Sequence, residues 1–134
     1  MKVITFGTFD LFHIGHLAIL ERAAEYGQVV VGVSTDALTY KKKKRYPVYN
    51  EQQRARIVAA LSAVSEVFYE ESLEKKRKYI IERRADLLVM GDDWKGNFDH
   101  LQDVCKVLYL ERTPSISTTT TIETIIDRST DVAN

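Results

Sequence analysis

Five short apolar segments, separated by stretches of helical periodicity, constrain the fold of this chain more than any other feature. The segments are rich in β-branched and aromatic residues, and the central ones are apolar without alternation. Such runs are typical of strands in a sheet that is covered on both faces. The predicted strands are residues 3–6, 29–33, 67–69, 87–90 and 107–110.

Helical periodicity fills the intervals between these segments. Leu17, Leu20 and Ala24 share one face of the first predicted helix, and Gly27 follows it as a C-cap. Asn50 with Gln53 resembles a capping box at the start of another helix. The predicted helices are residues 16–26, 50–64, 72–84 and 98–104, and a last one that Ser117 opens and that contains Ile122, Ile125 and Ile126.

The strand–helix alternation predicts right-handed βαβ crossovers and a parallel sheet. We therefore expect an α/β fold, a Rossmann-like doubly wound five-stranded parallel sheet. The 134 residues fit one domain, 1–134, with a tail from about residue 128 to 134 expected to be disordered. Sheets of this class bind ligands at the carboxyl ends of their strands, so the residues that follow each strand are the candidates for function.

The composition of the chain excludes several classes of protein. Nineteen basic residues balance nineteen acidic ones, so the whole molecule has no general electrostatic attraction for nucleic acid or an anionic membrane. One cysteine, Cys105, excludes an internal disulfide framework. The first residues do not read as a signal peptide, and no run approaches the roughly 20 apolar residues of a membrane span. We predict a cytoplasmic protein without membrane insertion or nucleic-acid binding.

Two histidines three residues apart follow the first predicted strand. His13 and His16 lie at a loop-to-helix junction, with Gly15 between them. A helix N-terminus offers unpaired N–H groups to an anion, and imidazoles add donors for phosphate oxygens. An unremarkable pair of surface and half-buried histidines explains the motif about equally well. A metal site is less favoured, because no Cys, His or carboxylate cluster has matching spacing.

Cations follow the second predicted strand, where residues 41–45 are all Lys or Arg. We predict that this run is a loop, which by itself suits either a solvated surface or a phosphate-rich ligand. For Asp36 just before it, a role in the site and a role in capping or loop hydrogen bonding are equally good explanations. Arg54 after it could equally be an exposed helix residue.

Polar groups also follow the last two strands. Asp92, Asp93 and Trp94 offer carboxylates and a flat indole to a base or another polar substrate group, with a turn and a packed tryptophan as the less favoured alternative. Arg112 suits a phosphate clamp. Hydroxyls at 117 and 118, at a predicted helix start, add neutral donors.

Three motifs in chain order resemble the signatures of the cytidylyltransferase-like nucleotidyltransferases. They are Gly7-Thr8-Phe9-Asp10 with His13-Ile14-Gly15-His16, then Gly91-Asp92-Asp93-Trp94, then Arg112-Thr113 with Ile116-Ser117-Thr118-Thr119. The resemblance extends from residue 2 to about 126. Class I aminoacyl-tRNA synthetases share the His-Ile-Gly-His tetrad, but this chain is too short for one and lacks Lys-Met-Ser-Lys-Ser.

Within that family the chain is similar to the small bacterial glycerol-3-phosphate cytidylyltransferases. The resemblance implies transfer of CMP from CTP to a small phosphorylated alcohol, with Mg²⁺ accompanying the CTP and a homodimeric enzyme. No covalent intermediate is expected, because a phosphate monoester is already a nucleophile and the sequence shows no activated Ser or Cys.

The resemblance also implies a role for each motif residue. His13 and His16 would contact the α-phosphate, with Lys42, Lys44 and Arg112 as further catalytic cations. No residue is expected to bind the metal directly. Acceptor contacts are implied for Asp10, Asp36, Lys44 and Arg54. Nucleotide contacts are implied for Gly7, Thr8, Phe9, Gly15, Asp92, Asp93, Trp94, Arg112, Ser117 and Thr118.

The chain departs from its subgroup at two places. Ser62 and Ser65 stand where the subgroup has an arginine and an aspartate, and Pro114-Ser115 replaces a Glu-Gly pair. These changes leave the reaction class alone but leave another acceptor open, such as ethanolamine phosphate or a polyol or sugar phosphate. Two further alternatives are an adenylyltransferase that uses ATP and a non-catalytic nucleotide-binding module.

Overall fold

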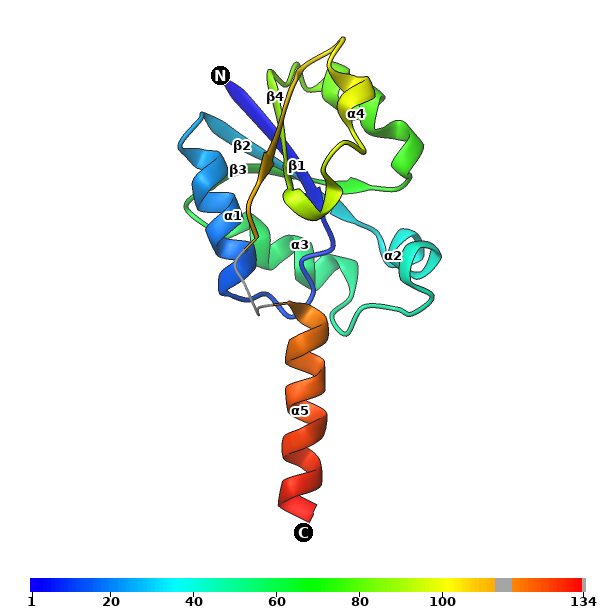
Figure 1. The fold of residues 1–134 in the computed structure, drawn as a ribbon. Helices are drawn as coiled ribbons and strands as arrows, with labels where there is room; N and C mark the ends of the chain where they lie inside the picture. The colour runs from blue at the N-terminus through cyan, green and yellow to red at the C-terminus, as the bar shows by residue number, and fades with distance from the viewer. Residues whose placement is uncertain (113–116, 134) are drawn as a thin grey trace.

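A five-stranded parallel sheet forms the centre of the molecule in the computed structural model, which describes residues 1–112 and 117–133, with side chains as far as residue 129. The sheet order is β3-β2-β1-β4-β5, so β1 is central and pairs with both β2 and β4 (Figure 1). This confirms the predicted fold class and all five strands. The strands are β1 Lys2–Gly7, β2 Gln28–Ser34, β3 Val64–Glu70, β4 Leu87–Gly91 and β5 Lys106–Leu110.

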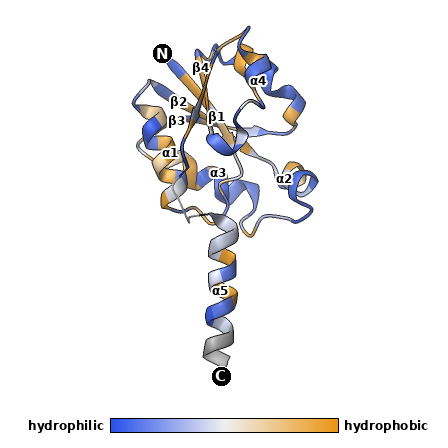
Figure 2. Cartoon of the chain, in the orientation of Figure 1, coloured by the Kyte–Doolittle hydropathy of each residue, from blue (hydrophilic) through white to orange (hydrophobic). Residues whose placement is uncertain are grey.

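Helices cover both faces of this sheet, which is what makes the fold doubly wound. On one face, α1 (Ile14–Ala24) and α3 (Glu51–Ala59) contribute Leu20 and Val58 to an apolar cluster with the strands. On the opposite face, α4 (Lys76–Glu82) contributes Ile80. The strands between these layers are largely hydrophobic, as Figure 2 shows. The chain changes faces between β1 and β4, and such a switch point opens a crevice at the strands' carboxyl ends.

One helix was not predicted. The run of cations lies mostly in α2 (Asp36–Lys43), where we expected a loop. The Thr35 hydroxyl accepts the N–H of Leu38 and caps the helix, and Leu38 itself is buried. Lysines in the last turn complement the negative end of the helix dipole, so consecutive cations are compatible with a helix here.

Three predicted helices are shorter than the sequence pattern indicated. The helix predicted for 50–64 ends at Ala59, because Val64 already pairs with Val29 as the first residue of β3. The interval 72–84 divides into a 3₁₀ turn, η1 (Leu73–Lys75), and α4. The interval 98–104 is reduced to η3 (Asp99–Leu101). Sheet pairing and burial therefore override periodicity at these boundaries.

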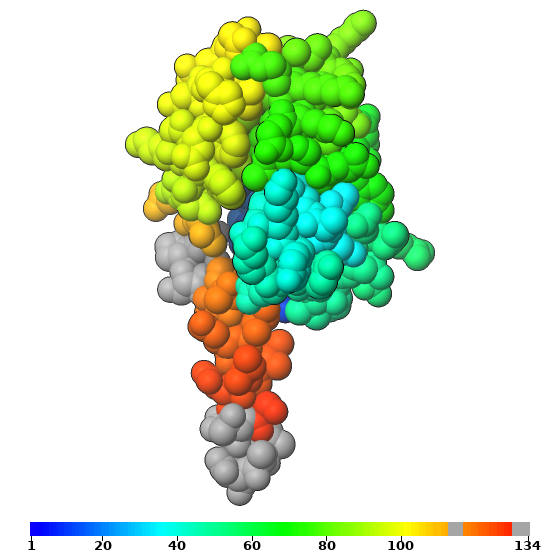
Figure 3. All heavy atoms as spheres, turned by 90° about the vertical axis from the view of Figure 1, so that its right-hand side faces the viewer, coloured from blue at the N-terminus to red at the C-terminus, as the bar shows by residue number. Residues whose placement is uncertain are grey.

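The last helix, α5 (Thr118–Ala133), projects away from the body of the molecule (Figures 1 and 3). Ser117 precedes it, as predicted, and its hydroxyl accepts the N–H of Thr120 at 3.0 Å. Residues 128–133 are part of α5, and disorder of the tail stays a prediction. Within the described part of the chain, no helix is both long enough and apolar enough to cross a bilayer.

Candidate active site at the carboxyl ends of the strands

A strained loop joins β1 to α1 and carries the first motif. Phe9 and Leu11 both have left-handed backbone conformations, with φ of 55° and 47°. Such geometry in side-chain-bearing residues is costly and is often found at functional sites. Phe9 is buried and packs edge-on against His16, with ring centroids 5.4 Å apart. The loop therefore fixes the position of His16 from one side.

The two imidazoles stack on each other at the start of α1, with ring centroids 3.8 Å apart and planes inclined by 20°. His13 is the N-cap, and its Nδ1 accepts the Gly15 N–H at 3.0 Å. His16 Nδ1 in turn accepts the His13 N–H at 3.2 Å. Because each Nδ1 accepts a hydrogen bond, the proton of each neutral ring lies on Nε2. Both rings are thereby available as Nε2–H donors.

The pKa values of both histidines favour these neutral forms. Burial lowers the pKa of His16 to about 3, assisted by electrostatic interactions with His13, Lys43 and Arg112. Burial and the Arg112 charge also lower the pKa of His13. His13 Nε2 is buried and has no hydrogen-bond partner among the described residues. A buried donor without a partner is costly, which makes this nitrogen a candidate ligand contact.

The structure separates the predicted lysine run into three environments. Lys42 Nζ donates to the Ser34 hydroxyl at 3.0 Å, on the β2 side of the site. Burial and the charges of Arg45, Arg54 and Arg112 lower the pKa of Lys43, Asp10 opposes that shift, and the charge of Lys43 in turn lowers the pKa of His16. Lys44 ends α2 in a left-handed conformation and is exposed. The sequence did not single out Lys43, because α2 was expected to be a loop and a loop gives no side-chain directions.

Arg54 is completely buried, which excludes the alternative of an exposed helix residue. Its guanidinium donates to the carbonyl oxygens of Tyr49, Thr8 and Ser34 at 2.7–2.9 Å. It also pairs with the Asp36 carboxylate at 2.7 Å. Arg54 therefore joins the loop after β1 to the end of β2, and whether it also contacts the acceptor stays a prediction.

Both predicted acceptor carboxylates bind the protein itself. Asp10 is buried and accepts the N–H groups of Val48 and Tyr49 at 2.7 and 2.9 Å. Asp36 accepts from Arg54, as described, and keeps a side chain that is 30% exposed. Each carboxylate has oxygen lone pairs beyond these bonds, so their predicted contact with an acceptor stays a prediction.

The ends of β4 and β5 supply the opposite side of the site. Gly91 leads into η2 (Asp92–Trp94), and a Cβ at this glycine would lie 2.6 Å from the Asp93 carboxylate. Asp93 and Arg112 approach each other to 3.6 Å while remaining about half exposed. Trp94 packs against Phe98 and leaves its indole partly exposed. The two motifs that were expected to bind nucleotide are therefore adjacent.

The start of α5 reaches back to the first loop. The Thr118 hydroxyl donates to the carbonyl of Asp10 at 2.8 Å. Two residues of the third motif, Thr113 and Ile116, lie outside the described residues. Arg112 pairs with Asp93 of the second motif and Thr118 bonds to Asp10 of the first, so all three motifs are joined at this end of the sheet.

A pair that the sequence did not single out closes the site on the β3 side. Glu70 ends β3 and binds the ammonium group of Lys76 on α4, and both residues are almost fully buried. A glutamate at the end of a predicted strand was the available signal. Its importance depends on burial, which the linear sequence does not reveal.

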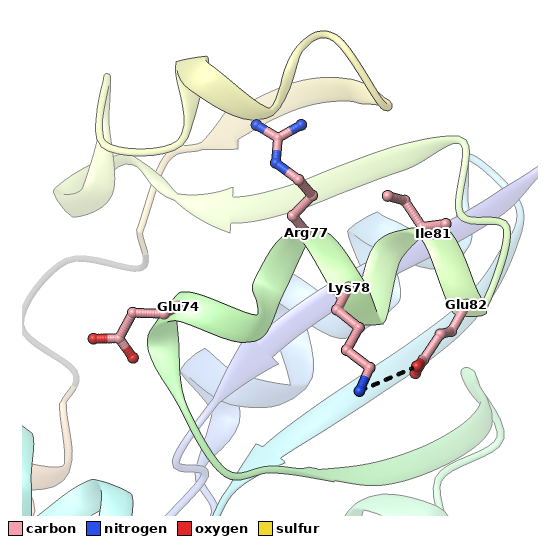
Figure 4. Close-up of a pocket in the computed structure, with 5 residues that line it drawn as sticks. All are labelled: Glu74, Arg77, Lys78, Ile81 and Glu82. Carbon is pink, nitrogen blue, oxygen red and sulfur yellow. Dashed lines mark ion pairs between the residues drawn. The ribbon is translucent and has the colours of Figure 1, made fainter.

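A shallow hollow on the outer face of α4 lies apart from all of these groups. Glu74, Arg77, Lys78, Ile81 and Glu82 line it, and Lys78 pairs with Glu82 at 3.8 Å (Figure 4). Its walls carry both signs of charge, and no residue of the three motifs belongs to it. In residues 1–112 and 117–133, no three His, Cys, Asp or Glu side chains are grouped to hold a metal ion.

Comparison with known proteins agrees with the arrangement of the motifs. The family model described as "Cytidylyltransferase-like" matches residues 4–124. The glycerol-3-phosphate cytidylyltransferase of Bacillus subtilis (strain 168) is 47% identical over 119 residues, covering 88% of this chain and 92% of its own length. The enzyme of the same name from Staphylococcus aureus (strain NCTC 8325 / PS 47) is 42% identical over 120 residues, with 88% and 89% covered.

A solved structure supports the fold independently. A lipopolysaccharide core biosynthesis protein from Thermoplasma volcanium GSS1 superposes with a TM-score of 0.75, covering 84% of this chain and 98% of that one. Its sequence identity is 23%, so this likeness concerns the fold alone.

Proposed function

This chain belongs to the cytidylyltransferase-like family, and we propose that it transfers CMP from CTP to glycerol 3-phosphate, forming CDP-glycerol and pyrophosphate. It is a nucleotidyltransferase, the enzyme class of its relatives. The observation that carries the proposal is the imidazole pair, in which the buried Nε2 of His13 has no partner among residues 1–112 and 117–129 and several cations act on His16. Neutral donors in that position suit a phosphate whose negative charge grows during reaction.

The reaction requires alignment and charge compensation more than acid–base chemistry. An oxygen of the acceptor's phosphate attacks the α-phosphorus of CTP, the bond from that phosphorus to the bridging oxygen breaks, and pyrophosphate leaves in line. His13 and His16 would donate from Nε2 to the α-phosphate oxygens. Arg112, Ser117 and Thr118 would hold the departing pyrophosphate, because they lie where β5 leads into α5.

The nucleoside would lie on the β4 side. Asp93 offers acceptors for the amino group of cytosine or for ribose hydroxyls, and Trp94 offers a partly exposed indole for stacking. The backbone at Gly7 and Gly15 brings the phosphates close to the start of α1, where N–H groups face an anion. We assign no base discrimination to a single residue.

Magnesium is proposed to enter with the nucleotide. The described groups around the imidazole pair are mainly cations and neutral donors, which suit phosphate oxygens more than a bare cation. Mg²⁺ would therefore bind to the triphosphate oxygens, where it neutralises charge on the leaving pyrophosphate. EDTA should abolish turnover, and excess Mg²⁺ should restore it.

The decisive experiment measures pyrophosphate release with CTP or ATP, each with and without glycerol 3-phosphate. We expect release only with CTP and glycerol 3-phosphate together, and CDP-glycerol as the second product. Release that needs CTP with ethanolamine phosphate or a sugar phosphate instead would refute the acceptor while keeping the reaction class. Preference for ATP would refute the cytidylyltransferase assignment. Trapping of radiolabelled CMP on the protein would refute the direct transfer.

Two broader properties are proposed from family membership. We propose a cytoplasmic enzyme, because its substrates would be cytoplasmic nucleotides and phosphate esters. We also propose a homodimer, which sedimentation equilibrium tests directly: a mass near twice 15.4 kDa is expected.

A further inference from the structure

Glu70 lies at the centre of a buried charge cluster that the proposed mechanism does not use. One carboxylate oxygen accepts the Ser34 hydroxyl at 3.1 Å, and the other binds the ammonium group of Lys76. The same Ser34 hydroxyl accepts from Lys42 Nζ at 3.0 Å. Glu70 is 1% exposed, so solvent does not provide its stabilisation. The cluster thus runs from Lys42 through Ser34 and Glu70 to Lys76.

Two lysines are linked to this single carboxylate, Lys76 directly and Lys42 through Ser34. The cluster therefore has one more positive charge than negative charge. Lys76 is held in place by Glu70 and by the faces of Phe6 and Phe98, whose ring centroids lie 4.6 and 5.3 Å from its Nζ. Lys42 is only half-buried, and its one hydrogen bond among the described residues is to Ser34. An ammonium group has three donors, so Lys42 can bind a ligand without breaking that bond.

The position of the cluster indicates which ligand this is. Nucleotide and pyrophosphate contacts are assigned to the ends of β4 and β5, on one side of β1, whereas Ser34 and Glu70 end β2 and β3 on the other side. An in-line displacement places the nucleophile opposite the leaving group. The attacking phosphate would therefore approach the imidazole pair from the side of Lys42.

We propose that Glu70 is a positioning residue that holds Lys42, through Ser34, with its free donors toward the phosphate of the acceptor. This inference rests on the proposed function. Glu70 has no contact with substrate in this role, because its carboxylate is 1% exposed and binds Ser34 and Lys76. Its role is to keep a half-buried ammonium group both charged and oriented.

Glu70 favours the protonated form of Lys42, whereas the other surroundings of this lysine disfavour it. Burial lowers the pKa of Lys42 to about 8, and the attraction of Glu70 opposes that shift. Lys76 on α4, Lys43 on α2 and Arg54 on α3 lower it further. Glu70 is the only acidic group among these influences in the described residues, so removing its negative charge should lower the pKa of Lys42 further.

Glu70→Gln, which keeps the shape and removes the charge, tests the proposal by steady-state kinetics with each substrate varied separately. We expect the KM for glycerol 3-phosphate at pH 7.5 to rise about threefold, because lowering the pKa of Lys42 by about one unit from about 8 reduces its protonated fraction at that pH about threefold. The KM for CTP should change less than about twofold. In the wild type the acceptor KM should rise above about pH 8, as Lys42 loses its proton. In Glu70→Gln that rise should begin at lower pH.

Glu71→Gln is the matched control, because it makes the same change one residue along the chain at a side chain that is 68% exposed. It should leave both KM values and the pH profile unchanged. Ser34→Ala provides a second route if Glu70→Gln does not fold, because it keeps the pair of Glu70 with Lys76 and cuts only the link to Lys42. It should raise the acceptor KM selectively.

The outcomes separate this inference from the proposed function. A wild type without CTP-dependent activity on glycerol 3-phosphate would overturn the function. An active wild type whose acceptor KM and pH profile are unaltered in both Glu70→Gln and Ser34→Ala would overturn the inference alone. Equal rises in both KM values would also overturn it, because they indicate a general structural role.

Discussion

Replacing Arg54 distinguishes a structural arginine from a substrate-binding one. Arg54→Met retains an unbranched apolar stem but removes the guanidinium, and Arg54→Lys keeps the charge without the fork. The wild-type side chain donates to three backbone carbonyls and one carboxylate, all within 2.9 Å. We expect both variants to lose stability, the first more than the second.

The magnitude follows from burial of the pair. Removing one partner of a buried ion pair typically costs about 3–5 kcal/mol, since the other partner and its acceptors stay behind. The Arg54 side chain is fully buried, but that of Asp36 is 30% exposed and recovers part of its hydration. We therefore expect a loss of about 3 kcal/mol for Arg54→Met and about 2 kcal/mol for Arg54→Lys. Against a typical total of about 5–15 kcal/mol, either loss is substantial.

Urea denaturation followed by circular dichroism measures these losses as shifts of the midpoint at constant slope. Arg56→Met is the matched control, because Arg56 is exposed on the same helix two residues later. It should change the free energy of unfolding by less than about 0.5 kcal/mol. Kinetics on the folded fraction of Arg54→Lys completes the test.

An Arg54→Lys variant that unfolds at the wild-type urea midpoint but has a greatly raised acceptor KM would refute the structural role of Arg54. That result would mean that the guanidinium is free to bind phosphate and that its contacts with the protein contribute little. Loss of stability with a nearly normal KM would support the structural role.

Three further predictions concern the imidazole pair and the lysines. His13→Asn keeps an N-cap side chain but removes the Nε2 donor, so kcat should fall about 10²–10³-fold while helix content by circular dichroism stays unchanged; an undiminished kcat would exclude the donor role. Because the pKa of His16 is lowered to about 3, the unfolded chain binds a proton below about pH 6.5 that the folded chain does not. The free energy of unfolding should therefore decrease as the pH is lowered below about 6.5, by at most about 1.4 kcal/mol per pH unit. His16→Asn should flatten that fall between pH 6.5 and 4 in urea titrations, and an unchanged slope would contradict it. Lys43→Ala should lower kcat/KM more than Lys44→Ala, because the charge of Lys43 is among those that lower the pKa of His16, and the reverse order in the pyrophosphate assay would refute this.

Local sequence was sufficient for the frame of the active site. The apolar strands, the Asn50 capping box and the His13-to-His16 motif depend on spacing along the chain, and the structure contains each of them. Since strands buried on both faces must be continuously apolar, their pattern predicts a doubly wound sheet, and the topology then brings all strand ends to one edge.

What the sequence by itself determined is therefore the order of elements, the edge at which function lies and the imidazole pair. The tertiary structure alone decided which charges are buried and which neighbours they have. Arg54 and Glu70 look like ordinary charged residues in the sequence, yet both are fully enclosed, and consecutive lysines diverge because α2 turns each by about 100° from the last. Burial and direction arise from packing between distant segments, and the energy of a charge depends on both.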